Sequence, residues 1–81
     1  MSDTLGPVVT FRFIEFNPRR AARGAVAARV AVLEDGEELC WLWMTPKDIQ
    51  NNLDEFGESE ELRKALAAYP QRMRQKAKQN P

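Results

Sequence analysis

The sequence predicts an α+β fold in which a three-stranded antiparallel sheet carries helices on one face. The segment 8–16, VVTFRFIEF, is rich in the β-branched and aromatic residues that favour strands. Asp35-Gly36 lies between two apolar segments and is typical of a two-residue hairpin turn. Thr45-Pro46 begins a stretch with helical periodicity. The predicted element order is therefore β-β-β-α-α.

A chain of 81 residues is expected to form one domain with a small core. Gly6-Pro7 ends a short leader, and no internal repeat or low-complexity segment follows. We therefore divide the chain into a flexible leader at 1–7, an antiparallel sheet at 8–44 and a helical part at 45–79.

A loop is predicted between the first two strands. Asn17-Pro18 opens it after strand 8–16, and Gly24 closes it, so that turn-forming residues bracket Arg19, Arg20 and Arg23. The second strand is expected at 25–34 and the third at 39–44.

The hairpin between these strands predicts a register. Asp35-Gly36 suits a type I′ turn, in which both central residues have positive φ, so Glu34 should oppose Glu37. Regular pairing then places Trp41 opposite Val30 and Trp43 opposite Ala28. Both faces of the third strand are apolar, which favours either a central strand or an exposed apolar face.

Two helices are expected after the sheet. Thr45 is a good N-cap with Pro46 at the first helical position, and the helix 46–56 ends at Gly57. Ser59 caps a second helix whose buried stripe is Leu62, Leu66 and Tyr69. Pro70 should break or kink this helix, and Met73 and Ala77 continue a weaker stripe to about residue 78.

Most of the large apolar residues are expected in the core. Phe11, Phe13, Phe16, Trp41 and Trp43 provide its aromatic part, although so small a domain has difficulty burying both faces of a Trp-rich strand. Surplus apolar surface rimmed by charge marks an interface. Cys40, the only cysteine, is expected to be a small buried apolar residue.

Charge is separated along the chain although the formal net charge is zero. Residues 34–61 contain ten acids and one base, whereas residues 62–81 contain six bases and no acid. Patches of opposite sign can steer a charged partner, so the neutral sum says little about the local field.

The sequence gives little support for catalysis. It contains no histidine, which removes the commonest general base and metal ligand, and one cysteine cannot build a zinc site. No phosphate-binding or nucleophile-elbow motif occurs. We expect a non-enzymatic protein without metal or cofactor. The sequence also lacks an apolar segment long enough to span a bilayer and a signal peptide, so we expect it to be cytoplasmic, without membrane contact.

Two charged surfaces are candidate binding sites. The first is acidic and would imitate nucleic-acid phosphate in a basic groove, with Asp35, Glu37 and Glu38 on the hairpin and Asp54, Glu55, Glu58, Glu60 and Glu61 around the helix junction. The alternative is basic and would contact nucleic-acid phosphate, with Arg19, Arg20, Arg23, Arg72 and Arg74. Solvated helix ends and a solubilising tail would explain many of these charges equally well.

In size, β-β-β-α layout, separated charge and lack of catalytic residues, the chain resembles the small anti-CRISPR proteins of phages and prophages that inhibit type I systems. The group shares no sequence motif, so no site residue is transferred. The resemblance implies an inhibitor that binds a subunit of the crRNA-guided surveillance complex (Cascade) or its nuclease and blocks target DNA. Effector channels are positively charged, which suits an acidic hairpin.

Two alternatives come from other functional classes. A nucleic-acid-binding accessory or regulatory protein would use the arginine loop and the basic C-terminal helix. A homo-oligomeric phage structural protein would pair through the tryptophan face, and the chain would then be a homodimer rather than a monomer.

Overall fold

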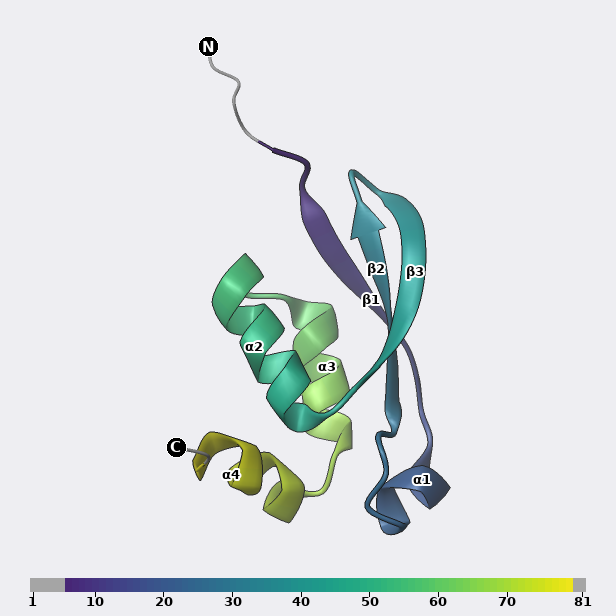
Figure 1. The fold of residues 1–81 in the computed structure, drawn as a ribbon, viewed down its shortest axis with the longest axis vertical. Helices are drawn as coiled ribbons and strands as arrows, with labels where there is room; N and C mark the ends of the chain where they lie inside the picture. Colours follow the sequence, from purple (N-terminus) through teal and green to yellow (C-terminus); the bar gives the residue numbers. More distant parts are fainter. Residues whose placement is uncertain (1–5, 80–81) are drawn as a thin grey trace.

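The computed structural model describes residues 6–79, with side chains described as far as residue 75. It confirms the α+β prediction, with a three-stranded antiparallel sheet and a helical layer beside it (Figure 1). The elements are β1 (Val9–Phe16), α1 (Pro18–Ala22), β2 (Ala28–Glu34), β3 (Glu37–Met44), α2 (Pro46–Phe56), α3 (Glu60–Ala68) and α4 (Gln71–Gln79). The predicted leader lies mostly outside the described residues.

The strand order is β1-β2-β3, so the Trp-rich third strand lies at an edge of the sheet and not at its centre. The hairpin turn before it has the predicted conformation, because Asp35 has φ 51° and Gly36 has φ 85°. Both values belong to the left-handed region that a type I′ turn requires. The Asp35 carboxylate also accepts a hydrogen bond of 3.0 Å from the Val8 backbone N–H, which ties the turn to β1.

The predicted register of the hairpin is wrong beyond its second residue pair. Glu34 opposes Glu37 as expected, and Val32 then opposes Cys40 because Leu39 is an extra residue in β3. Such a bulge places two residues of one strand opposite a single residue of its neighbour, and every later side chain changes face. Trp41 therefore opposes Ala31 and Trp43 opposes Arg29, instead of Val30 and Ala28.

The predicted loop after β1 contains the short helix α1. The Asn17 side chain accepts hydrogen bonds from the backbone N–H groups of Arg19 and Arg20, and Pro18 occupies the first helical position. An N-cap followed by proline is a helix start signal that outweighs turn chemistry here. Gly24, with φ 76°, then turns the chain towards β2.

The helices after the sheet begin and end where capping predicts. Thr45 and Asp48 form a reciprocal capping box at the start of α2, and Gly57, with φ 97°, ends it. Ser59 caps α3 through the Leu62 N–H. Pro70 breaks the predicted helix rather than kinking it, so α4 is a separate helix, and the expected Ala77 contact lies outside the described side chains.

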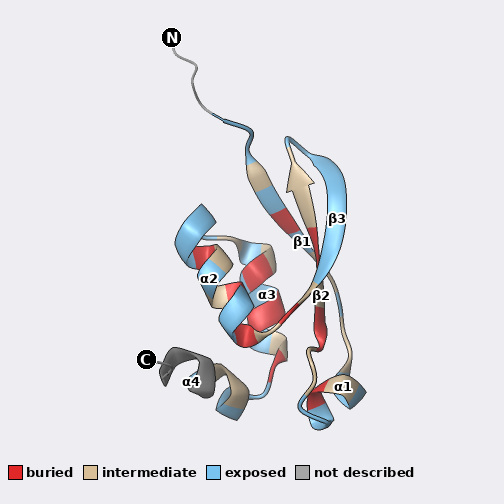
Figure 2. Ribbon diagram, viewed as in Figure 1, coloured by how far each residue is buried: buried red, intermediate tan, exposed pale blue. Residues whose placement is uncertain are grey.

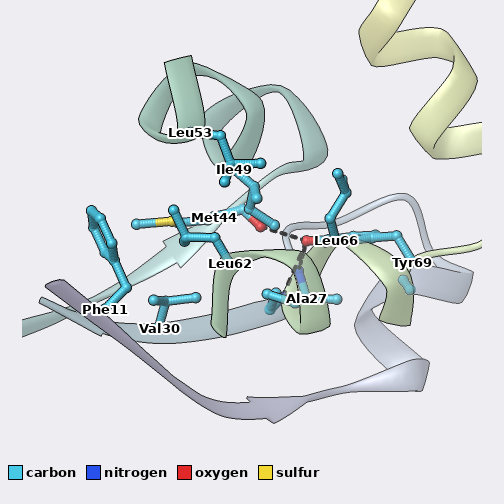
Figure 3. Close-up of a cluster of buried hydrophobic side chains, with 12 residues drawn as sticks. Phe11, Ala27, Val30, Met44, Ile49, Leu53, Leu62, Leu66 and Tyr69 are labelled. Atoms are coloured by element: carbon cyan, nitrogen blue, oxygen red, sulfur yellow. Dashed lines mark hydrogen bonds between the residues drawn. The ribbon is translucent and has the colours of Figure 1, made fainter. Parts of the chain in front are cut away.

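The core lies between one face of the sheet and the helices (Figures 2 and 3). Tyr69 crosses it, because its hydroxyl donates to the Met44 carbonyl at 2.6 Å and accepts from the backbone N–H groups of Ala27 and Ala28 at 2.8 and 3.1 Å. These bonds satisfy the hydroxyl and three backbone groups where β2 and β3 diverge. The face that α2 and α3 cover is called the inner face below.

Candidate interaction surface

The opposite face of the sheet is called the open face. It carries charged and aromatic side chains instead of a second helical layer, because the bulge at Leu39 turns both tryptophans away from the core. Six of its residues come from the sheet and one from α1: Arg12, Glu15, Arg29, Glu38, Trp41 and Trp43, and Arg20.

Arginine and tryptophan side chains stack on this face. The Arg29 guanidinium lies 4.8 Å from the Trp41 ring centroid and 4.7 Å from that of Trp43. The Arg20 guanidinium lies 4.1 Å from the centroid of Trp43, and its Nε donates to the Val26 carbonyl at 2.6 Å. Stacking of this kind is favourable and fixes long side chains that would otherwise be mobile.

Two carboxylates fix the ends of this stack. Glu15 pairs with Arg29 at 3.1 Å. Glu38 pairs with Arg12 and also accepts a hydrogen bond of 3.0 Å from the Trp41 indole N–H. The open face is thus a layer of fixed side chains, with cationic, anionic and aromatic groups side by side.

Exposure is concentrated on β3, which Figure 2 shows in pale blue along most of its length. Trp41 is 56% exposed on the open face, and Leu39 at the bulge is 57% exposed. Leu42 and Cys40 belong to the inner face by register but extend past the helices, so Leu42 is 47% exposed. The prediction of a buried Cys40 is therefore wrong, because an edge strand outside the helical cover leaves it exposed.

The predicted acidic residues lie in two groups. Asp35, Glu37 and Glu38 are exposed at the hairpin, where Glu38 is held by the Arg12 ion pair. The other group follows α2 and opens α3: Asp54, Glu55, Glu58, Glu60 and Glu61. Figure 1 shows the hairpin tip beyond the helical layer, so the two groups are not a single patch.

Three residues of the second acidic group, Glu58, Glu60 and Glu61, line an open groove of about 290 Å³ between β1 and the α2–α3 junction. Glu58 pairs with Arg63, whose hydrogen bond lowers the pKa of that carboxyl. Glu61 accepts a hydrogen bond of 2.8 Å from the Phe13 backbone N–H, and this bond, followed by the one from Lys64, lowers the Glu61 pKa. Glu61 thereby joins α3 to β1, a structural role that its place in the sequence does not reveal.

The predicted basic residues are also divided. Arg19, Arg20 and Arg23 lie on or directly after α1, whereas Arg72 and Arg74 belong to α4, on the other side of the molecule (Figure 1). Arg74 donates to the Tyr69 carbonyl at 3.0 Å and is partly buried. The arginine loop therefore contributes to the open face through Arg20, while α4 lies beside α2.

Sequence reasoning missed Arg12, Arg29 and Glu15 as members of a surface. Alternation alone places Arg29 on one face and Val30 on the other, which signals a polar open face. The bulge that brings the tryptophans to Arg29 has no comparable signal, because Leu39 is an ordinary strand residue.

Within residues 6–79, no helix has the length and apolar content required to cross a bilayer. No group of three or more cysteine, aspartate or glutamate side chains in the described part of the chain is placed to hold a metal ion. Comparison with protein families, curated proteins and solved structures gives no significant match.

Proposed function

We propose that this chain is a non-enzymatic binding protein that recognises a protein partner through its open face. One observation carries the proposal: Trp41 and Trp43 lie on the solvent side of the sheet and pack against arginines instead of the core. Tryptophan and arginine are the residues most enriched where binding energy concentrates in protein interfaces.

The fixed geometry of the face supports this proposal. Arg20 and Arg29 are held by stacking and by polar contacts, so little side-chain entropy remains to be lost on binding. Glu15 and Glu38 offset part of the positive charge. A surface that mixes both signs around aromatic rings suits a protein of mixed charge better than a uniform polyanion.

As the specific partner we propose a type I CRISPR effector complex, which the chain would inhibit by occupying a charged surface. The support for this partner is the resemblance in size, layout and charge separation. Asp35 and Glu37, exposed at the hairpin tip, are the acids suited to contact a basic channel.

Binding to the purified effector complex, and loss of its binding to target DNA, test both levels of the proposal. Trp41→Ala should weaken binding by roughly tenfold or more, as expected for an interface tryptophan. Phe56→Ala is the matched control, because Phe56 is an aromatic residue that is 46% exposed at the end of α2, outside the open face. Absence of binding by the unaltered protein would exclude this partner, and equal binding by Trp41→Ala would exclude the open face.

A second candidate function is binding of single-stranded nucleic acid. It is favoured by Trp41, whose exposed ring stacks on Arg29 on an open sheet, and by exposed Arg19 and Arg23 near α1. Aromatic rings beside cations form stacking platforms for bases. Oligonucleotides should quench tryptophan fluorescence in a salt-dependent way that Arg19→Ala/Arg23→Ala reduces. Unchanged fluorescence at low salt would exclude this function.

A further inference from the structure

The outer edge of β3 has the properties of an unprotected strand. No strand in the described part of the chain pairs with it, and Glu37 to Leu42 are all exposed. Proteins usually protect such edges with lysine, proline, inward charges or bulges. Here the bulge and the acids Glu37 and Glu38 lie at the start of the strand. The segment from Cys40 to Met44 contains none of these devices, so it is free to pair with another strand.

Charge differs between the two ends of this edge. The hairpin end carries Asp35, Glu37 and Glu38, which are exposed. At the other end Arg20 and Arg29 stack on Trp43, and exposed Lys47 follows in the first turn of α2. An antiparallel neighbour of the same sequence would place its acidic end beside this basic end, whereas a parallel neighbour would place like charges together.

We propose that a second copy of this chain occupies the β3 edge, in an antiparallel pair that joins two sheets into one. A two-fold axis through Leu42 produces an antiparallel pair in which the acidic end of each strand lies beside the basic end of the other. It places Leu42 opposite Leu42 of the second copy, Trp41 opposite Trp43, and Glu37 near Lys47. Opposed residues in an antiparallel pair share a face, so each exposed leucine covers the other on the inner side. The interface is self-complementary, as a two-fold dimer requires.

This inference goes beyond the proposed function, because it concerns the edge of the sheet and not its open face. In the pair, the open faces of both copies lie on the same side and form one continuous surface. Loss of the dimer through Leu42, which lies on the inner face, is therefore distinguishable from loss of partner binding through Trp41.

The test is the mass of the full chain in solution by sedimentation equilibrium, from low micromolar to near-millimolar concentration. The unaltered chain should form a dimer. Leu42→Lys should weaken it by roughly tenfold or more, since two lysines would then face each other across the axis. Val8→Lys, which adds the same charge at another exposed apolar residue, should leave the dimer unchanged.

Exchanging the charges of Glu37 and Lys47 tests whether the two β3 strands run antiparallel in the dimer. Glu37→Lys and Lys47→Glu should each weaken the dimer several-fold at low salt, and the double variant should restore it. Lys47→Glu places an acid in the first turn of α2, where the helix dipole favours it, so the fold is expected to remain intact.

Cross-linking tests the register. In a Cys40→Ser background, Leu42→Cys should form an intermolecular disulfide on mild oxidation, because the two residues 42 would face each other within disulfide distance. A chain that stays monomeric throughout the concentration series, or a dimer that Leu42→Lys does not affect, overturns the proposal. Cross-linking of the unaltered chain through Cys40, with no cross-linking of the Cys40→Ser/Leu42→Cys variant, overturns the proposed axis.

Discussion

The two edges of the sheet are protected to very different degrees. At the β1 edge, α3 packs against the strand, and the Glu61 carboxylate accepts a hydrogen bond from the Phe13 backbone N–H, so this outward donor already has a partner within the chain. At the β3 edge, most of the strand is exposed and its apolar residues face solvent on both sides. Since an exposed edge strand tends to pair with other chains, this difference supports the proposal that β3 takes part in binding, whereas β1 contributes to the fold.

The largest change in the free energy of unfolding is expected when a leucine on the covered side of the sheet is replaced by alanine. The same replacement on β3 provides the comparison. Leu62→Ala removes a fully buried side chain of α3 and should lower the free energy of unfolding by about 2–5 kcal/mol. Leu42→Ala removes a side chain that is 47% exposed and should cost less than about 1 kcal/mol. Urea denaturation of dilute protein measures both values.

An equal loss of stability in the two variants would contradict the comparison, because Leu42 would then belong to the core. Dilute protein is essential, since association through β3 would stabilise the unaltered chain and exaggerate the cost of Leu42→Ala.

Tyr69→Phe should have the next largest effect on the covered side. The ring would stay in place, but the Met44 carbonyl and the N–H groups of Ala27 and Ala28 would lose their partner. Buried polar groups without partners are costly, so the free energy of unfolding should fall by about 2–4 kcal/mol. Thermal denaturation followed by circular dichroism measures the loss, and faster amide exchange at Ala27 and Ala28 would locate it. Unchanged exchange there would contradict the assigned role of the hydroxyl.

The fold was largely predictable because local signals agree with one another. Asp35-Gly36 fixes the hairpin turn, Thr45-Pro46 begins α2, and Gly57 ends it, each for a reason contained in a few neighbouring residues. The alternation of Arg29 and Val30 likewise separates a polar face from an apolar one. These features required no knowledge of tertiary contacts.

The open face was not predictable to the same degree. Its composition depends on the single extra residue Leu39, which reverses the faces of Trp41 and Trp43. The role of Glu61 depends on a hydrogen bond to Phe13, 48 residues away. Both are tertiary facts, and the charge pattern alone gave Glu61 the same weight as its solvated neighbours.

Deletion of Leu39 should have a smaller effect, about 1 kcal/mol, because it removes the bulge and leaves the pairing on either side intact. Trp41 should stay exposed, as iodide quenching of tryptophan fluorescence would show. If the hairpin had a regular register, the same deletion would reverse the faces of all later residues. A large change in quenching would therefore contradict the bulge.

The smallest change in stability is expected for Glu61, whose carboxylate accepts the hydrogen bond at the β1 edge. The hydrogen bond from Phe13 lowers the Glu61 pKa in the folded chain below its ordinary value of 4.5. The stability that Glu61 contributes is thus present above about pH 4.5 and is lost as the pH falls through its lowered folded pKa. Glu61→Gln keeps an oxygen that can accept the hydrogen bond from the Phe13 N–H, but the glutamine side chain has no ionisable group.

Glu61→Gln should therefore lose less stability on acidification than the unaltered chain, with a difference under about 1 kcal/mol for so accessible a group. The melting temperature between about pH 6 and pH 3 measures this difference. Glu60→Gln removes the same charge from the exposed neighbouring residue of α3 and should leave the pH dependence closer to that of the unaltered chain. If both variants respond alike, general charge on α3 controls the acid response, and closure of the β1 edge depends on packing alone.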